Sequence, residues 1–510
     1  MQSSGSLVVP LQQWAPVHPA ALAHREVAGA PRPPGASRDA ALAAALEARN
    51  AAWGNPVADE IARWRAGAEV VVSGQQPGLL GGPHLTLIKA CAVAAEVGLR
   101  RAAGHDAVGF FWLATNDDDL PELGWGRVAV GEEVLAVREE NWRQGDVTAG
   151  HVPLSAATAA LLEEIAKRNR GDRAREAVAL AAQCYRPGVS LGEATGSFLG
   201  QLLRGLGVVL VDALEPALAV AARGALVNVL TQLPKAWEAL ETDGAAMRAQ
   251  GWPVPLRLSA VRLPMFRLSH GRRERLASRH GTCAPELLRE IEKYPERFSP
   301  NVWLRPLVQD AALHTSTVLL GGAELAYHLQ GRALWELAGV SRPTWRLRPH
   351  VTVVTAAERR LAAQLRITPE ELLARHPPRR LLPGAAVERQ QATMARQLAT
   401  HLARLEAAAE RDLPMLTGDV RATAAKVTAA LAWLQHRTAV ARARSSEVEA
   451  QRWRRLTAFL RPDGLPQERR LSVLGLLLRL GPEWPAQLTA VLDPSDPGMH
   501  LMCWEEGGPW

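Results

Sequence analysis

The stretch that decides the fold runs from Glu69 to Val97 and reads EVVVSGQQPGLLGGPHLTLIKACAVAAEV. Residues 69–73 have strand character, the loop that follows carries four glycines and two prolines, and a helical run begins at His84. A strand, a glycine-rich turn and a helix N-terminus favour a bound anion, because backbone amides can approach it closely and the helix dipole attracts it. The glycine spacing matches neither the dinucleotide fingerprint nor the P-loop, so a flexible loop before an ordinary helix is the alternative.

Three further segments extend this pattern. AVGFFWLATNDDDLPEL (107–123) and GVVLVDALEP (207–216) are apolar runs that stop at polar residues, and STVLLGGAELAYHLQG (316–331) repeats the order of strand, glycines and helix. Continuous apolar runs suit strands that are buried on both faces, as in parallel sheets, and a strand–helix–strand order makes a βαβ unit. The sequence therefore predicts an open α/β sheet whose ligands lie at the carboxyl ends of the strands.

The sheet is interrupted by mostly helical sequence, which divides the chain into eight expected segments. These are a lead-in packed on the core (1–65), a first core segment (66–127), a first, helical insertion (128–190), a second core segment (191–216), a second insertion (217–298), a third core segment (299–385), a helical coiled-coil arm (386–460), and a closing helical segment with a tail (461–510).

The arm shows a heptad pattern in its second half. Apolar or small residues from Val420 to Val448 alternate spacings of four and three, and an earlier run from Met394 to Leu405 could pair with them across the turn DLPMLTGD. We expect a long helical hairpin that forms a homodimer, and packing of the arm on its own core is the alternative.

Composition excludes several classes of function. The chain has 510 residues, 47% of them hydrophobic, and a net charge of +7, but only five of its 59 basic residues are lysines. The arginines are scattered through helices, which favours solvated faces over nucleic-acid binding. The four cysteines lie far apart without zinc-ligand spacing, so we expect no structural metal and a reduced, cytoplasmic protein. No apolar run is long enough to span a bilayer and no export signal is evident, so we expect no membrane association.

The first set of candidate site residues surrounds the glycine turn. Gln75 and Gln76 follow the strand, where their amides could bond a carboxylate, a phosphate or a base edge, or could cap the turn. Lys89, one turn into the helix after Thr86, could reach an anion held at the helix start, although a solvated lysine is the alternative. His84 could donate to a phosphate oxygen or serve as a cap.

The second set is the acidic tetrad Asn116-Asp117-Asp118-Asp119 at the end of the strand FFWLA. Adjacent carboxylates repel one another, which raises at least one pKa and couples their titration. Such a group could bind an ammonium ion, hold Mg²⁺ against a nucleotide, or act as general base on an amine. An acidic turn that caps the next helix is the alternative.

The third set lies between residues 296 and 331. Arg305, Gln309 and Asp310 share one helical face, and Gly321-Gly322 form a second strand-to-helix turn that is followed by two polar residues on one face, Glu324 and Tyr327. This set offers an arginine for a carboxylate or phosphate, an aspartate for an amine, and backbone amides for a second anion. We find no Ser/His/Asp or Cys/His arrangement, which argues against covalent hydrolysis.

These segments together carry a family resemblance. SGQQPGLLGGPHLTLIKA, FFWLATNDDDLPE, FSPNVWLRPLVQDAALHTSTVLLGGAELAY and LPQERRLSVLGLL resemble the bacillithiol biosynthesis cysteine-adding enzyme family, BshC. The resemblance implies a Rossmann-like core with connecting-peptide insertions, similar to nucleotidyltransferases and class I aminoacyl-tRNA synthetases, and a dimerising coiled-coil arm. It also implies a ligase that joins cysteine through an amide bond to the amine of glucosaminyl malate.

The family motifs map onto single positions of this chain. The GQQ turn falls on Gly74 to Gln76, the Gly-Pro on Gly82 and Pro83, and the RP…QD motif on residues 305–310. The family's Glu-Asp-His-Asp motif falls on the acidic tetrad, so its first Glu and its His are absent, and only the two Asp positions are kept. His84 replaces a usually apolar residue, and Ala323 stands where the family tends to have a longer Gly-Pro-Gly turn.

Making an amide from a free carboxylate and an amine is uphill in water, so we expect activation by ATP, with Mg²⁺ as an option. Asp117 and Asp119 would bind or deprotonate the amine, which must be neutral to react. A non-catalytic nucleotide-binding scaffold with a partner-recruiting arm, or a divergent amide ligase for a related substrate, remains open. The expected catalytic residues are Asp117, Asp119 and Lys89. The residues expected to bind substrate or nucleotide are Gly74, Gln75, Gln76, Gly78, Gly82, Pro83, His84, Thr86, Trp112, Asn116, Asp118, Asp212, Asn301, Arg305, Gln309, Asp310, Gly321, Gly322, Glu324 and Tyr327.

Overall fold

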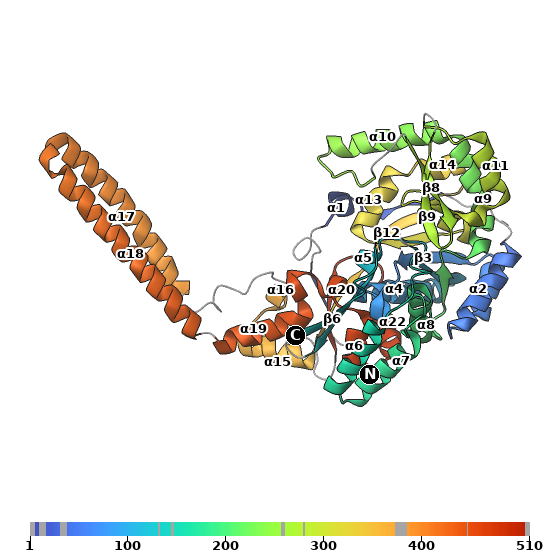
Figure 1. Cartoon of the computed structure of the whole chain (residues 1–510), viewed down its shortest axis with the longest axis horizontal. Helices are drawn as coiled ribbons and strands as arrows, with labels where there is room; N and C mark the ends of the chain where they lie inside the picture. The colour runs from blue at the N-terminus through green and yellow to red at the C-terminus, as the bar shows by residue number, and fades with distance from the viewer. Residues whose placement is uncertain are drawn as a thin grey trace. The chain divides into compact units, whose positions relative to one another are not determined.

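A computed structural model describes residues 6–9, 17–30, 38–130, 133–143, 147–256, 261–278, 281–372, 385–445 and 447–504. The chain forms two compact units (Figure 1). Unit 1 comprises Met1–Val354 and Leu465–Trp510, and unit 2 comprises Thr355–Gly464.

Unit 1 is built on a six-stranded sheet. The strand order is β2 (Glu26–Val27), β12 (Thr344–Leu347), β11 (Thr317–Leu320), β3 (Glu69–Gln75), β4 (Ala107–Leu113) and β7 (Val208–Asp212). All neighbours pair in parallel except the edge strand β2, which is antiparallel to β12. The prediction of a parallel, Rossmann-like α/β core is confirmed, and the inner strand β4 is buried along its whole length, as its unbroken apolar run predicts.

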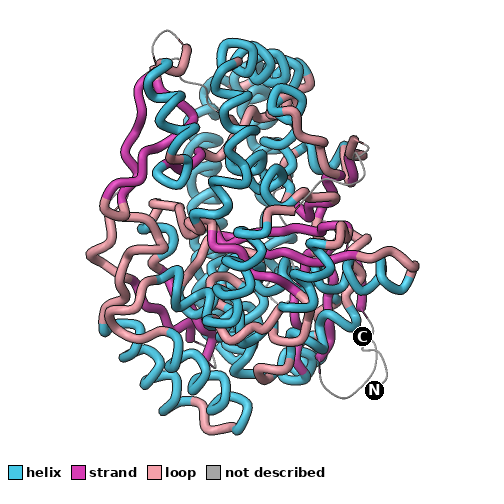
Figure 2. Tube along the Cα trace, turned by 90° about the vertical axis from the view of Figure 1, so that its right-hand side faces the viewer, coloured by secondary structure: helices cyan, strands magenta, loops and turns pink. Residues whose placement is uncertain are grey.

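Helices cover both faces of this sheet (Figure 2). On one face, alternate strand residues such as Val72 and Phe110 join a single core cluster with α2 (Ala40–Ala52), α3 (Ala58–Arg65), α9 (Pro216–Thr231), α12 (Arg305–Leu313) and α14 (Leu334–Ala338). On the other face lies α4 (His84–Ala102), which approaches so closely that a Cβ on Gly109 would meet Val93 at 2.7 Å. The β3–α4–β4 unit is therefore the tightly packed centre of the fold.

The insertions add smaller elements around the sheet. Residues 120–203 form α5 (Leu120–Leu123), the hairpin β5 (Trp125–Val130) and β6 (Glu133–Arg138), α6 (Ala156–Arg168), α7 (Asp172–Cys184) and α8 (Leu191–Leu203). Residues 233–300 form α10 (Leu233–Ala249), β8 (Arg262–Ser269), β9 (Arg272–Ala277), α11 (Pro285–Lys293) and β10 (Phe298–Pro300), with the three strands in one antiparallel sheet.

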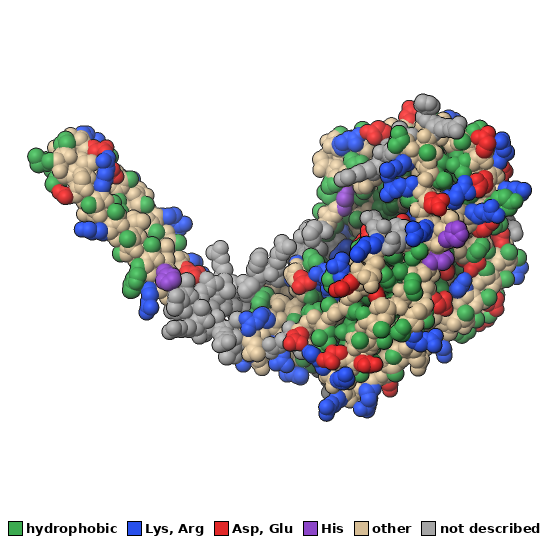
Figure 3. Space-filling view, in the orientation of Figure 1, with side chains coloured by type: hydrophobic (Ala, Val, Ile, Leu, Met, Phe, Trp, Pro, Cys, Tyr) green, Lys and Arg blue, Asp and Glu red, His purple; other side chains and the backbone are tan. Residues whose placement is uncertain are grey.

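The remaining elements of unit 1 come from its N-terminal segment, from residues 322–355 and from its C-terminal segment. They are β1 (Ser6–Val9), α1 (Pro19–Ala23), α13 (Gly322–Gln330), β13 (His350–Thr355), α20 (Gln467–Arg470), α21 (Val473–Leu480), α22 (Trp484–Val491) and β14 (Met499–Trp504). The segment that was expected to be a tail thus holds a strand, because β14 lies between β1 and β13 in a three-stranded sheet. Basic and acidic side chains are interspersed on the face of the unit in Figure 3.

Unit 2 is helical. It consists of α15 (Ala356–Leu365), α16 (Pro369–Leu372), α17 (Ala385–Asp412), α18 (Thr417–Ser445) and α19 (Glu447–Leu460). Helices α17 and α18 form the predicted hairpin, joined by a hydrogen bond of 2.8 Å from Gln391 Nε2 to Thr438 Oγ1. The half-buried residues of α18 include Val420, Ala424, Val427 and Leu431, as the heptad pattern predicts, but Leu434 of the same pattern is 39% exposed. The side chains of its last three members, Ala441, Ser445 and Val448, lie outside the described residues. On α17, Met394 and Leu405 are 39% and 55% exposed. The coiled-coil arm is confirmed, and its role in a homodimer stays a prediction.

Among the residues that the structure describes, no single helix is long and apolar enough to cross a membrane. Helices α9 and α10 pass that test only as a pair bent by 81°.

Candidate functional site

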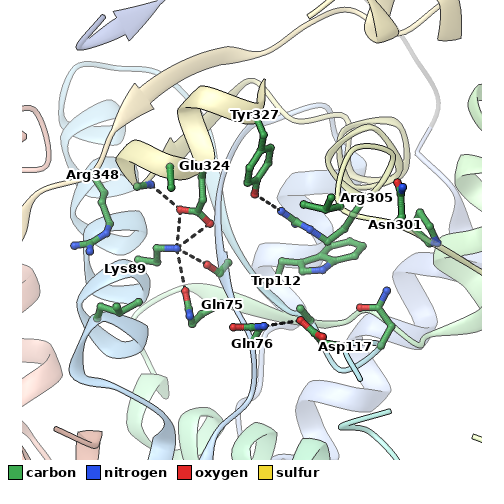
Figure 4. A pocket seen from close by; sticks show the side chains of 18 of the residues that line it. Gln75, Gln76, Lys89, Trp112, Asp117, Asn301, Arg305, Glu324, Tyr327 and Arg348 are labelled. Atoms are coloured by element: carbon green, nitrogen blue, oxygen red, sulfur yellow. Dashed lines mark hydrogen bonds and ion pairs between the residues drawn. The ribbon is translucent and has the colours of Figure 1, made fainter. Parts of the chain in front are cut away.

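A cavity of about 420 Å³ lies in unit 1 at the carboxyl ends of β3 and β4 (Figure 4). This is the edge at which an open parallel sheet holds its ligands. The residues that line the cavity include these predicted ones: Gly74, Gln75, Gln76, Lys89, Trp112, Asn116, Asp117, Asn301, Arg305, Gly321, Glu324 and Tyr327. They come from β3, α4, β4 and the segment after it, from α12 and the segment before it, and from α13 and the turn before it. The structure thus brings together residues from all three predicted sets.

Lys89 ties two walls of the cavity together. Its Nζ donates to Glu324 Oε2 at 2.8 Å, to Gly74 O at 2.8 Å and to Gln75 Oε1 at 3.1 Å. An ammonium group has three N–H donors, and these three acceptors occupy all of them. Burial opposes ionisation of Glu324, but the charge and hydrogen bond of Lys89 and the Gly321 amide lower its pKa to about 2. Lys89 and Glu324 therefore form a buried ion pair that joins α4 to the start of α13.

The acidic tetrad is split between partners. Asp117 faces the cavity, where its Oδ2 accepts a hydrogen bond of 2.5 Å from Gln76 Nε2. Asn116 Nδ2 donates to Ser299 Oγ at 2.9 Å. Asp118 and Asp119 do not line the cavity, and Arg273 pairs with Asp118 at 3.1 Å. Burial, followed by the charges of the two neighbouring aspartates, raises the pKa of Asp119, as expected for adjacent carboxylates.

The third set is also divided. Arg305 donates to the Tyr327 hydroxyl at 2.9 Å, and both side chains lie above the Trp112 ring in Figure 4. Trp112 lines the cavity with a buried indole N–H that has no hydrogen-bond partner among the described residues. Gln309 and Asp310 lie behind this wall, where Asp310 accepts a bond of 2.9 Å from Trp335 Nε1 in the core.

The later part of the glycine loop, residues 78–83, does not line the cavity. The Gly81 amide donates to the Tyr185 hydroxyl at 2.7 Å, which in turn donates to Gly78 O at 2.9 Å. The His84 amide donates to Leu471 O at 2.8 Å. The amides that were expected to hold an anion are thus used within the protein. The predicted residues that the structure leaves outside the cavity here are Gly78, Gly82, Pro83, His84, Thr86 and Gly322.

Asp212 lies in a second cavity of about 380 Å³, together with Arg49, Thr115 and Glu193. Asp212 Oδ1 accepts hydrogen bonds from Thr115 Oγ1 and, at 3.0 Å, from the Leu214 amide. The end of β7 is therefore separated from the main cavity.

Three arginines that line the cavity were not predicted from the sequence: Arg273, Arg348 and Arg469. Arg469 lies within LPQERRLS, a motif that was noted for its resemblance alone, and Arg348 directly follows a strand. Arg273 comes from an arginine-rich hairpin in which nothing distinguishes it. Within the described ranges, no group of three or more His, Cys, Asp or Glu side chains could hold a metal ion.

Known proteins resemble this chain over most of its length. A putative cysteine ligase BshC from Chlorobaculum tepidum is 26% identical over 470 residues, which cover 85% of this chain and 82% of the relative. Proteins of the same name from Koribacter versatilis and Thermus thermophilus are 27% and 30% identical and cover 82% and 78% of this chain, and 81% of each relative. The shared name denotes an enzyme that forms a carbon–nitrogen bond.

Among solved structures, methionyl-tRNA synthetase of Mycobacterium tuberculosis bound by methionyl-adenylate aligns with this chain at 12% sequence identity. The alignment covers 85% of this chain and 98% of that chain, with a TM-score of 0.26. Two family models match almost the whole chain. The model of the BshC N-terminal Rossmann-like domain matches residues 28–349, and that of the BshC C-terminal coiled-coil domain matches residues 351–504. The chain therefore belongs to the BshC family of bacillithiol biosynthesis.

Proposed function

We propose that this enzyme joins the carboxyl group of cysteine to the amine of glucosaminyl malate, with ATP as the source of free energy. The observation that carries the proposal is one cavity that holds a carboxylate able to accept a proton, Asp117, beside arginines able to take negative charge. The names of the relatives support cysteine as one substrate, and the name of the family supports bacillithiol biosynthesis as the pathway.

The reaction requires a neutral amine, because an ammonium group has no lone pair for attack on a carbonyl carbon. Asp117 is the acceptor we propose for the proton that leaves the amine. Gln76, which follows the neighbouring strand β3, donates to one carboxylate oxygen, and the Asp119 amide donates to the other at 3.1 Å. These two bonds hold the carboxylate in place.

The carboxylate partner must be activated, and a nucleoside triphosphate supplies that free energy when it is bound. The donors that could take its charge are Arg305 on α12 and the indole N–H of Trp112, which lacks a partner among the described residues. The amides of Gly81 and His84 already donate to Tyr185 and Leu471. In this proposal the contacts to the anion therefore come from side chains.

We further propose that the arm mediates a homodimer and that the enzyme acts in the cytoplasm. The apolar side chains on the outside of the arm hairpin support the dimer: Met394, Leu405 and Trp433 are 39%, 55% and 64% exposed. The four free cysteines are compatible with a reducing compartment.

The test is product formation, followed by mass spectrometry, from glucosaminyl malate, cysteine and ATP. We expect Asp117→Asn to lower the rate by about a hundredfold or more, the usual contribution of a general base. Asp106→Asn is the matched control, because Asp106 is an exposed aspartate paired with Arg63 far from the cavity.

Unchanged turnover of the Asp117 variant would contradict the proposed proton acceptor. Product formation without ATP would contradict the activation scheme. Absence of product in the wild-type protein with all three substrates would favour a non-catalytic scaffold.

A further inference from the structure

Three charged side chains that line the main cavity have no ion-pair partner among the described residues: the carboxylate of Asp117 and the guanidinium groups of Arg305 and Arg469. The paired groups are Lys89 with Glu324, Arg273 with Asp118, and Arg348 with Glu468. Arg305 and Arg469 also line the cavity, and neither forms an ion pair with a described carboxylate. The cavity therefore presents two guanidinium groups without a direct carboxylate partner, against the one unpaired carboxylate of Asp117.

Arg469 reaches the cavity from the far end of the chain because its neighbours are fixed. Gln467 is buried and bonds both backbone groups of Val353, accepting from its N–H at 2.9 Å and donating to its carbonyl at 3.1 Å. Glu468 is fully buried and accepts two hydrogen bonds from Arg348, at 2.7 Å and 3.1 Å. These contacts hold α20 against β13 and the connection that precedes it. Arg469 follows Glu468 directly in the sequence, and its side chain is exposed at the cavity.

Glu468 also contacts a histidine, so it lies at the centre of a buried polar cluster. Its Oε1 is 2.7 Å from Nδ1 of His350. Burial opposes ionisation of Glu468, but Arg348 and then His350 lower its pKa well below the usual value. The carboxylate is therefore charged whenever the protein is folded near neutral pH, and its hydrogen bonds to Arg348 persist.

We propose that Arg305 and Arg469 form a subsite for a small ligand with two negative charges, and that Glu468 is a positioning residue for Arg469. Guanidinium groups bind carboxylates and phosphates through charge-assisted hydrogen bonds, which are the strongest such contacts a side chain makes. The cavity wall offers two more donors, because Trp112 Nε1 and Arg348 Nε are buried without partners among the described residues.

Two sources share this chemistry, a dicarboxylate such as the malate part of the proposed substrate and the phosphates of a nucleotide. The choice between these two ligands rests on the proposed function. The existence of the subsite rests on the cavity lining alone. Titration calorimetry of the full chain with L-malate, inorganic pyrophosphate and acetate distinguishes them. We expect malate or pyrophosphate to bind and acetate, which has one charge, to bind at least tenfold more weakly.

The decisive variant is Arg469→Met, which removes the charge and keeps much of the apolar stem. We expect it to weaken binding of the preferred dianion by about tenfold or more, the usual effect of a lost charge-assisted hydrogen bond. Arg470→Met is the matched control, because Arg470 is the adjacent residue and does not line the cavity. Affinity that is unchanged in Arg469→Met, or lost equally in Arg470→Met, would overturn the subsite, as would a wild-type protein that binds neither dianion.

A double-mutant cycle tests the positioning role. If Glu468 acts through Arg469, Glu468→Gln should weaken dianion binding, and the double variant should bind no more weakly than Arg469→Met alone. Losses that add would overturn the positioning role. Gln467→Ala provides a second probe of the same contacts if Glu468→Gln does not fold, and it should show the same lack of additivity.

The readout is binding, so it is independent of the reaction. Dianion affinity that falls in Arg469→Met supports the subsite even if no amide product forms. Amide formation by a wild-type protein whose Arg469→Met variant keeps full dianion affinity would leave the ligase in place and overturn the subsite.

Discussion

Two strand-to-helix turns lie side by side in this molecule and differ in what their residues contact. The turn from β3 to α4 and the turn from β11 to α13 both follow a parallel strand with glycines, and the two strands pair directly. In the first turn Gln75 and Gln76 line the main cavity, but the amides of the loop that follows bond Tyr185 and Leu471, and that loop is buried. In the second turn Gly321, Glu324 and Tyr327 face the main cavity.

The difference comes from what covers each turn. The first is covered by α8 and by the segment before α21, and a Cβ on Gly81 would meet Val473 at 2.7 Å and Phe198 at 3.0 Å. The second has its backbone against α1, where a Cβ on Gly322 would meet Ala21 at 3.1 Å, so its polar side chains are left to face the cavity. The same local pattern thus gives a structural turn in one place and a ligand-facing turn in the other.

The strongest link between the two turns is the ion pair of Lys89 and Glu324, and breaking it should have the largest effect. We expect Glu324→Ala to lower the free energy of unfolding by roughly 3 kcal/mol, because it leaves the buried Lys89 ammonium without a counter-charge. Urea denaturation measures this loss. The double variant Lys89→Met/Glu324→Ala should regain part of it, and a double variant less stable than the sum of the two single losses would contradict the pair.

Two tyrosines separate the roles of the turns. Tyr185→Phe should cost about 1–3 kcal/mol of unfolding free energy, because it leaves the buried Gly81 amide without its partner, and should leave dianion affinity unchanged. Tyr327→Phe should instead weaken dianion binding several-fold, because Arg305 loses the hydroxyl that orients it, with a smaller change in stability.

Tyr294→Phe is the control for both, since the Tyr294 ring contacts Lys293 and Arg297 away from the cavity and neither turn depends on it. If Tyr185→Phe weakens ligand binding as much as Tyr327→Phe does, the distinction between a structural and a ligand-facing turn fails.

The helix that follows each turn contains a buried histidine, which predicts a dependence of stability on pH. Burial lowers the pKa of His84 to about 3, against weaker opposing effects of the Ser472 backbone and Glu468, and lowers that of His328 to about 4. A folded pKa below the unfolded value of about 6.5 means that the unfolded chain binds more protons. Stability should therefore be full above pH 6.5 and should fall as pH drops from 6.5 towards 4 and then 3.

His84→Leu should be the mildest of these changes near neutral pH, within about 1 kcal/mol of wild type. Neither ring nitrogen of His84 makes a well-formed hydrogen bond with a described residue, so an apolar side chain of similar size loses little. Below pH 6.5 the variant should lose stability more slowly than wild type, as measured by melting temperature from pH 8 to pH 4. Parallel curves for the two proteins would show that His84 titrates normally in the folded state.

Much of the site could be predicted from the chain because strand ends are readable. The polar residues after β3 and β4, such as Gln76 and Asp117, were placed correctly at the sheet edge by the apolar runs that precede them. Gln309 and Asp310 share a helical face with Arg305 in the sequence pattern, yet they lie in the core, because Asp310 bonds the Trp335 indole. Helical periodicity shows which residues share a face and does not show what the face contacts.

By itself, then, the amino-acid sequence determined the parallel sheet, the strand-to-helix turns and the helical hairpin of the arm. Those features follow from the spacing of apolar residues and glycines over a few turns of chain. Only the tertiary structure decided that the glycine loop is sealed and that Arg469 stands with Arg305 in one cavity lining. Hydrogen-bond and charge partners of such residues come from segments hundreds of positions away, and no local periodicity records them.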